Sequence, residues 1–280
     1  MSINYFLAMK KHYLKLTSAM LVLSSFIFLG CSKDDDSSGD NNTPSVTIEQ
    51  KNRALVIDIT GTWCPPCGAY GIPGFNDGIA KGKDKMVPFA IHVSDPLTVA
   101  GMTPVASMGR FMTTSVPRIA VGNGLAFPAG VYTDIGLTGD KIIESVDTFI
   151  ANNPVVVGVA LNNLKVDGSN ISVDVHSKFF NTAATGDYQM AVYFYENGVI
   201  SSQKMSGQPD NPNQQHDHTI RAIATPSAWG EAISISGDTR TKTYTAPMNA
   251  AWKSANMGAI AVIWKKITSS DYLYINGNIK

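Results

Sequence analysis

The sequence is poor in cysteine and in net charge. Three cysteines occur in 280 residues, and they include a single Cys-x-x-Cys pair. A structural zinc site would therefore need two more ligands from elsewhere in the chain. The first 30 residues hold three lysines and no acid, which leaves 19 basic and 22 acidic side chains in the remainder. This balance gives no electrostatic footprint for nucleic acid, so we expect no nucleic-acid partner.

Charged residues make up 16% of the sequence, against 44% hydrophobic residues. This composition predicts a packed core rather than a disordered chain. The apolar stretch over residues 16–29 is interrupted by serines and too short for a comfortable transmembrane helix. Because Lys10, Lys11 and Lys15 precede it, the stretch predicts a secretory signal peptide over residues 1–30.

The signal peptide ends in Phe28-Leu29-Gly30-Cys31. This ending resembles a bacterial lipobox, in which cleavage leaves Cys31 as a lipidated N-terminus whose acyl chains anchor the protein to a membrane. An ordinary signal peptide with an unrelated cysteine is the alternative. Residues 31–45 predict a flexible acidic tether, since they offer almost nothing apolar to bury. Such an arrangement resembles the surface-export signals of Bacteroidota lipoproteins and implies an outer-membrane, surface-exposed lipoprotein. Attachment facing the periplasm is the alternative.

The stretch that points most clearly to a reaction is Trp63-Cys64-Pro65-Pro66-Cys67. An apolar run over residues 54–59 predicts a buried strand, and the two prolines suit the first turn of a helix. Free backbone N–H groups and the helix dipole at that point favour a thiolate on Cys64. Cys67 is then placed to resolve a mixed disulfide. With Cys31 lipidated, these two cysteines pair or stay free, and an oxidising compartment favours the disulfide.

Three further residues strengthen the redox interpretation. Asp58 lies six positions before Cys64 inside the apolar strand, where burial beneath the cysteine pair would raise the pKa of its carboxyl. Trp63 precedes the nucleophile and is placed to shield one side of it. Downstream, Val116-Pro117 comes just before a short apolar run.

Together these segments resemble the thioredoxin family. The resemblance implies that Pro117 is a cis-proline facing the disulfide, that Val116 offers its backbone to a substrate, and that Asp58 shuttles a proton for Cys67. One departure is the glycine-rich stretch after Cys67, which predicts a weak, kinked or interrupted active-site helix. Further strands are expected over residues 86–93 and 118–121. Helices are expected over 103–112 and over 138–150, the latter capped by Thr138.

The pattern changes at Asn152-Asn153-Pro154. Regularly spaced apolar runs with turn signals and no helical period predict an all-β sandwich, immunoglobulin-like or jelly-roll-like, over residues 154–280. Within it, His216 and His218 are weak metal-ligand candidates, since residues two apart on a strand face the same side. A polar loop with histidines bonded to the backbone is the favoured interpretation, so we expect no metal.

The sequence therefore predicts a signal peptide (1–30), a tether (31–45), an α/β thioredoxin-like domain (46–153) and a β-sandwich domain (154–280). This combination resembles the thioredoxin-like outer-membrane lipoproteins of Bacteroidota. It implies a membrane-anchored thiol–disulfide oxidoreductase acting on protein thiols or disulfides without a cofactor. Two alternatives stay open: a structural disulfide on a repurposed scaffold, and a surface binding module whose β domain recognises a partner.

Overall fold

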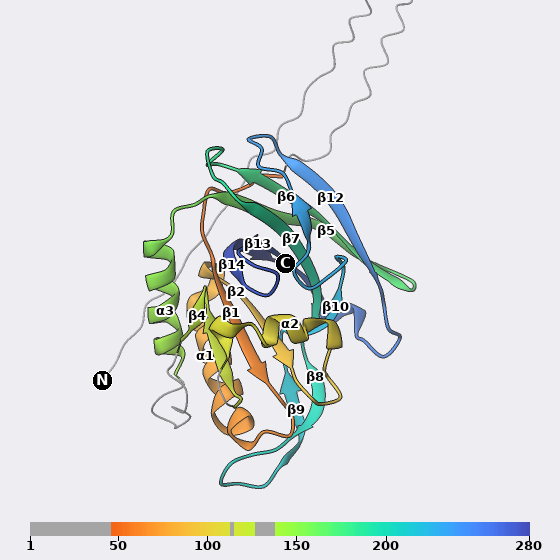
Figure 1. Cartoon of the computed structure of the whole chain (residues 1–280). Coiled ribbons are helices and arrows are strands. Elements are labelled where there is room, and N and C mark those ends of the chain that lie inside the picture. Colours follow the sequence, from red (N-terminus) through yellow and green to blue (C-terminus); the bar gives the residue numbers. More distant parts are fainter. Residues whose placement is uncertain (1–45, 113–114, 127–137) are drawn as a thin grey trace, which may run out of the picture. The chain divides into compact units, whose positions relative to one another are not determined.

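The central strand of the N-terminal part is β1 (Ala54–Thr60), and every residue in it is buried. It pairs in parallel with β2 (Met86–His92) and antiparallel with β3 (Arg118–Val121), which in turn pairs with β4 (Gly124–Leu125). A strand covered on both faces has no solvent side, which explains why all of its residues except Asp58 and Thr60 are apolar. The computed structural model describes residues 46–112, 115–126 and 138–280 (Figure 1). The expected signal peptide (1–30) and the whole expected tether (31–45), with Cys31, lie outside these residues.

Two helices pack together beside this sheet, α1 (Ile72–Gly82) and α3 (Gly139–Asn152). Their contact is close at Gly78, where a Cβ atom would lie 2.9 Å from the Ile142 side chain. The α3 helix begins after Thr138, whose hydroxyl accepts a hydrogen bond from the Lys141 N–H at 3.4 Å. The predicted helix with its cap is therefore confirmed.

The helix predicted over residues 103–112 is wrong in length. The structure has a single α-helical turn, α2 (Thr103–Ala106), between 3₁₀ turns at Ala100–Met102 and Gly109–Phe111. The chain becomes extended at Met108, with ψ at 132°, and this interrupts the helical hydrogen bonding. Two other 3₁₀ turns lie at Lys83–Lys85 and Ser254–Asn256.

The sheet continues beyond β2 into the C-terminal half of the chain. Strand β10 (Thr219–Ile223) pairs in parallel with β2 at Thr219 and Ala90, and antiparallel with β7 (Asp187–Glu196) on its other side. Next come β13 (Met257–Lys266) and β14 (Tyr272–Ile279), while β11 (Glu231–Ile233) adds to β7. The strand order is β14-β13-β7-β10-β2-β1-β3-β4.

A second sheet, in the order β12-β6-β5, covers one face of this extension (Figure 1). Its strands are β5 (Val157–Asp167), β6 (Asn170–Phe179) and β12 (Arg240–Pro247). Alternate residues of β7 and β13 therefore serve two cores. One set packs against the second sheet: Met190, Val192, Phe194, Ala259, Ala261 and Ile263. The other set joins the core of the thioredoxin-like part: Ala191, Tyr193, Tyr195, Ile260, Val262 and Trp264.

This architecture confirms the predicted fold class, an α/β thioredoxin-like part followed by a strand-rich part built from packed sheets. The two parts belong to the same compact unit, Ser45–Lys280, because one sheet and one core run through both. The boundary proposed between residues 153 and 154 thus marks a change in sequence pattern. The main sheet contains strands from both sides of it.

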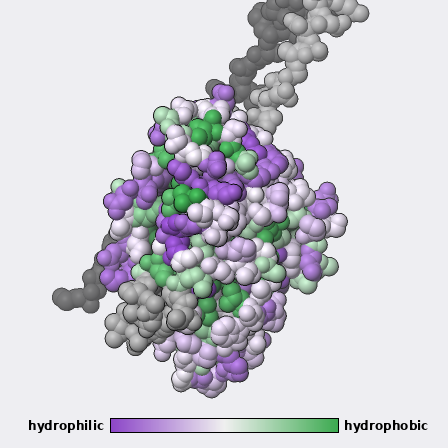
Figure 2. Space-filling view, viewed as in Figure 1, coloured by the Kyte–Doolittle hydropathy of each residue, from purple (hydrophilic) through white to green (hydrophobic). Residues whose placement is uncertain are grey.

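The surface carries no large apolar area on the face drawn in Figure 2, where hydrophobic side chains form small separate patches among polar ones. Within the described part of the chain, no helix is both long and apolar enough to span a bilayer.

Candidate active site

The cysteine pair lies where β1 gives way to a helical segment. A turn closed by the Cys64 N–H bonding to the Gly61 carbonyl at 3.0 Å follows the strand. Residues Cys67–Gly71 then form a π-helical turn that leads into α1, with Pro73 in the first turn of α1. Proline lacks the N–H that a continuous α-helix needs, and π-turns occur at such positions. The predicted interruption of the active-site helix is confirmed.

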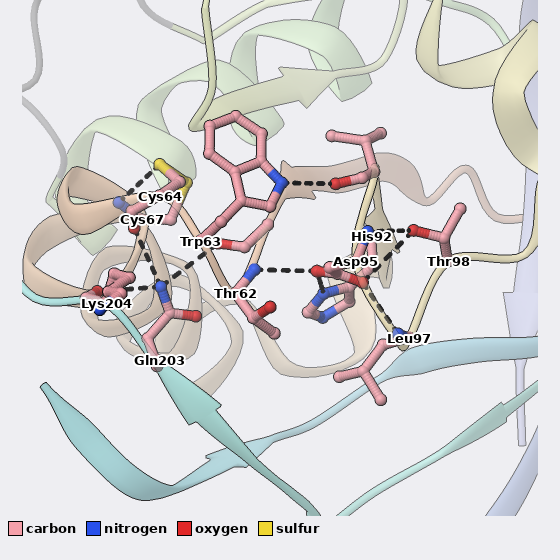
Figure 3. A network of polar contacts seen from close by, with 12 residues as sticks. Thr62, Trp63, Cys64, Cys67, His92, Asp95, Leu97, Thr98, Gln203 and Lys204 are labelled. Atoms are coloured by element: carbon pink, nitrogen blue, oxygen red, sulfur yellow. Dashed lines mark hydrogen bonds and ion pairs between the residues drawn. A yellow bond between two sulfur atoms is a disulfide. The ribbon is translucent and has the colours of Figure 1, made fainter.

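Cys64 and Cys67 form a disulfide, with their Cα atoms 5.3 Å apart. The Cys67 N–H points at the Cys64 sulfur at 3.2 Å (Figure 3). This donor would remain available to a Cys64 thiolate after reduction, and hydrogen bonding to the charged form lowers a pKa. The geometry therefore favours Cys64 as the ionised member of the pair.

The predicted cis-proline is present as a cis Val116–Pro117 bond. The Val116 carbonyl lies 3.5 Å from the Cys64 sulfur, so this loop faces the disulfide. On the other side, a Cβ atom at Gly71 would lie 2.9 Å from the Pro117 side chain. Glycine at position 71 thus allows the helix to approach the proline loop closely.

Asp58 is 1% exposed, and burial raises the pKa of its carboxyl to about 7. The raised pKa predicted from the sequence is confirmed. One carboxyl oxygen, Oδ1, has no hydrogen-bond partner among the described residues. A carboxyl with a pKa near neutrality is able both to accept and to release a proton at physiological pH.

Trp63 is 49% exposed beside the disulfide, in the position predicted for a shielding residue. Its indole N–H donates to the Val93 carbonyl at 2.9 Å, which fixes the ring across the turn at Gly61 (Figure 3). A large exposed aromatic side chain held at one end is suited to contacting an incoming polypeptide.

A hairpin from the C-terminal half packs directly on the cysteine turn, and sequence reasoning missed it. Its strands are β8 (Val199–Gln203) and β9 (Asn211–His216). The buried Gln203 side-chain amide donates to the Cys64 carbonyl at 2.9 Å and lies 3.3 Å from the Gly61 carbonyl (Figure 3). The Lys204 N–H donates to the Thr62 carbonyl at 2.8 Å. The polar sequence over residues 201–218 predicts a long loop, so this hairpin was not expected.

The hairpin also explains a second glycine of the active-site helix. A Cβ atom at Gly68 would lie 2.4 Å from both the Lys204 carbonyl oxygen and the Met205 sulfur. Because real Cβ atoms do not approach backbone so closely, only glycine fits at position 68 without displacement of the hairpin.

Asp95 ties the cysteine turn to the end of β2. Its carboxylate accepts hydrogen bonds from the Thr62 and Leu97 N–H groups, each at 2.8 Å, and lies 2.7 Å from His92 Nδ1 (Figure 3). Burial by itself would raise the pKa of Asp95, but the His92 interaction and these donors outweigh it and lower the pKa. An ionised Asp95 therefore holds His92 through its Nδ1–H.

The two candidate metal histidines contact different neighbours. His216 ends β9 and lies edge-to-face with His92, with ring centroids 5.0 Å apart. His218 follows in a turn with φ at 54° and stacks on Tyr195 at 5.3 Å. The single strand face assumed for the pair does not exist here. Among the described residues, no cluster of three or more His, Cys, Asp or Glu side chains has metal-binding geometry.

The fold and the disulfide together define a thioredoxin-like protein with an appended strand-rich part, and comparisons with known proteins agree. A stretch of 64 residues is 34% identical to thioredoxin H4 of Arabidopsis thaliana, covering 23% of this chain and 53% of that one. A stretch of 73 residues is 34% identical to thioredoxin H-type of Brassica campestris, covering 26% and 58%. The chain thus spans little more than half the length of these relatives.

The C-terminal part matches a different family. Residues 145–270 match the family model described as outer membrane protein Omp28. Among solved structures, HBP35 of Porphyromonas gingivalis is similar over 84% of this chain and 76% of its own, with a TM-score of 0.64 and 14% identity, which shows a shared fold. The resemblance to thioredoxin-like outer-membrane lipoproteins is confirmed, and the outer-membrane localisation expected from the sequence agrees with the Omp28 match.

Proposed function

We propose that the protein is a membrane-anchored thiol–disulfide oxidoreductase. The observation that carries this proposal is the Cys64–Cys67 pair at the start of a helix, facing a cis-proline loop, with a backbone donor aimed at the Cys64 sulfur. Similarity to thioredoxins supports it. The substrates are protein thiols or disulfides that dock in extended form along Val116-Pro117 and against Trp63.

The chemistry proceeds in two exchanges. The Cys64 thiolate attacks a substrate disulfide, forms a mixed disulfide and releases one substrate sulfur as a thiolate, which takes up a proton. Cys67 then gives its proton to the Asp58 carboxylate and attacks the Cys64 sulfur, which releases the second substrate thiolate. Two electrons pass from the cysteine pair to the substrate. The same steps in reverse oxidise a substrate dithiol.

Replacing Cys67 by serine should trap the intermediate. We expect the Cys67→Ser protein to accumulate covalent adducts with cellular proteins that dithiothreitol releases, because Cys64 still attacks but nothing resolves the product. The measurement is non-reducing electrophoresis and mass spectrometry of protein recovered from the native cell. The Cys64→Ser protein is the matched control and should carry few adducts. Equal adduct levels in both would contradict the assigned roles.

A surface binding module with a structural disulfide is the second candidate. The burial of both cysteines favours it, since Cys64 is 2% and Cys67 0% exposed. The reduction potential separates the two functions. We expect a value in the range of about −120 to −270 mV for a catalytic pair, whereas a structural disulfide lies below about −300 mV. Equilibration with glutathione and thioredoxin redox buffers measures it.

We also propose that Cys31 is lipidated and that it tethers the protein to the outer membrane through the acidic segment. The Cys31→Ser protein should appear in the soluble fraction, because the acyl chains supply the membrane affinity. Cell fractionation and metabolic labelling with a fatty acid test this. Ser32→Ala is the control and should stay membrane-bound. A Cys31→Ser protein that still fractionates with outer membranes would remove the lipoprotein assignment.

A further inference from the structure

A small cavity lies behind the active site, lined on its polar side by Asp58, Thr60, His92 and His216. Its volume is about 10 Å³, which is close to the size that one water molecule needs. Asp58 and Thr60 share a face of β1, and His92 lies opposite Thr60 on β2. His216 comes from the C-terminal hairpin.

Each of these four residues has a buried polar atom without a partner in the described structure: Asp58 Oδ1, Thr60 Oγ1, His92 Nε2 and His216 Nε2. Leaving one such group unpaired costs on the order of 1–3 kcal/mol. Four unpaired atoms around one cavity therefore indicate a site built to hold a hydrogen-bonding occupant. A single water molecule fits the volume and offers up to four hydrogen bonds.

The orientation of His92 determines which of its ring nitrogens faces the cavity. Its Nδ1–H donates to the Asp95 carboxylate, so in the neutral ring the unpaired Nε2 is an acceptor. Nε2 therefore points into the cavity as the atom that can accept a hydrogen bond or a proton from its occupant, while Asp95 fixes the orientation of the ring. His216 faces His92, and Asp217 continues the lining toward the half-buried turn before β10.

We propose that this cavity is a proton-transfer site, in which a water molecule, His92 and His216 carry the proton between the buried Asp58 carboxyl and the surface at Asp217. The proposal rests on the proposed oxidoreductase function. After Asp58 takes the proton of Cys67, its carboxyl O–H bond breaks and the proton passes through the water to His92 Nε2. The imidazolium then returns the proton through His216 toward Asp217 and bulk water, and no electrons move.

The charges around the cavity are consistent with this role. Burial lowers the pKa of His216 to about 4, so its ring is neutral at pH 7 and able to relay rather than store a proton. The titratable groups that line the cavity with Asp58 are His92 on β2, with Asp95 behind it, His216 on β9 and Asp217 in the following turn, and the reduced Cys67 is the proposed proton donor to Asp58. Helix α1 contributes Ile72, Phe75 and Asn76, none of which is charged.

The kinetic test uses the reduced protein and an aromatic disulfide that releases a coloured thiolate at each exchange. The first release reports attack by Cys64, and the second reports resolution by Cys67. We expect His92→Gln and His216→Gln to slow the second release at least tenfold at pH 6–7 and to leave the first unchanged. His218→Gln is the matched control and should alter neither, because this neighbouring histidine stacks on Tyr195. Equal slowing of both steps, or of neither, would overturn the proposal.

A second measurement is independent of thiol chemistry. On transfer of the oxidised protein into D₂O at pH 5, the carboxyl band of Asp58, identified by its loss in Asp58→Asn, shifts as the proton exchanges. We expect this exchange to be at least tenfold slower in His92→Gln and His216→Gln than in the parent or His218→Gln. Unchanged exchange would refute the relay while leaving the oxidoreductase function intact. Slower exchange in a protein that never reacts with disulfides would refute only the function. If the His92→Gln protein fails to fold, the exchange rate measured in His216→Gln tests the proposal by itself.

Discussion

At pH 8 the oxidised Asp58→Asn protein should unfold at a higher urea concentration than the parent. In the folded protein burial raises the pKa of Asp58 from 3.8 to about 7. Between pH 4 and pH 7 the carboxyl is therefore protonated in the folded protein and ionised in the unfolded chain. The stability of the parent therefore falls as pH rises from 4 to 7, and the asparagine variant escapes this loss. A shift of about 3 pKa units corresponds to a difference on the order of 4 kcal/mol at pH 8.

Urea titrations at several pH values from 4 to 8 measure this effect, with exposed Asp238→Asn as the control. The gain in Asp58→Asn should shrink toward zero at pH 4, whereas the control should follow the parent throughout. The same variant should resolve a mixed disulfide roughly 10²-fold more slowly, since asparagine cannot accept the proton of Cys67. Parallel stability curves for the parent and Asp58→Asn would show that the buried carboxyl does not titrate as the structure indicates.

Replacing Trp264 by alanine should destabilise both halves of the molecule together. Trp264 belongs to β13 in the C-terminal half, yet it is fully buried in the core that also contains β1. Its ring lies edge-to-face with Trp229 and Tyr274, and its N–H donates to the Tyr193 hydroxyl at 3.3 Å. Truncating a buried tryptophan to alanine costs about 3–5 kcal/mol.

Hydrogen exchange followed by mass spectrometry distinguishes joint from separate unfolding. We expect Trp264→Ala to reduce protection of β1 and of β7 by similar factors, because one sheet contains both. Ile267→Ala, at an exposed position just after β13, is the control and should change stability by less than about 0.5 kcal/mol. Loss of protection in β7 with β1 unaffected would show that residues 154–280 unfold by themselves.

The features predicted from the sequence are those encoded within short segments. The apolar run before Cys64, the carboxyl of Asp58 and the two prolines all lie within residues 54–66, so local patterns determine where they go. The cis bond before Pro117 followed from the resemblance to thioredoxins. The interrupted helix after Cys67 was predicted from its glycines. The structure shows a different role for them, since Gly68 allows the hairpin and Gly71 allows the Pro117 loop to approach the helix closely.

The features that sequence reasoning missed depend on contacts between distant segments. Gln203 lies 139 positions after Cys64, and nothing in its surroundings marks it as a partner of that turn. His92 falls in the strand predicted over residues 86–93, and its contacts with Asp95 and His216 are visible only in three dimensions. The short strand β10 had no distinct periodic signal, so its insertion between β2 and β7 was not anticipated.

The position of β10 also constrains the order of assembly during synthesis and export. The sheet that supports Cys64 needs a strand from residues 219–223, so β2 keeps an open edge until most of the chain has emerged. Unpaired edges of this kind invite pairing with other chains. The N-terminal part therefore depends on late-arriving sequence, and chains halted before residue 219 should leave Cys64 and Cys67 open to alkylation after mild reduction. Pulse-labelling of such truncated chains would show whether the active site is sealed only at the end of translocation.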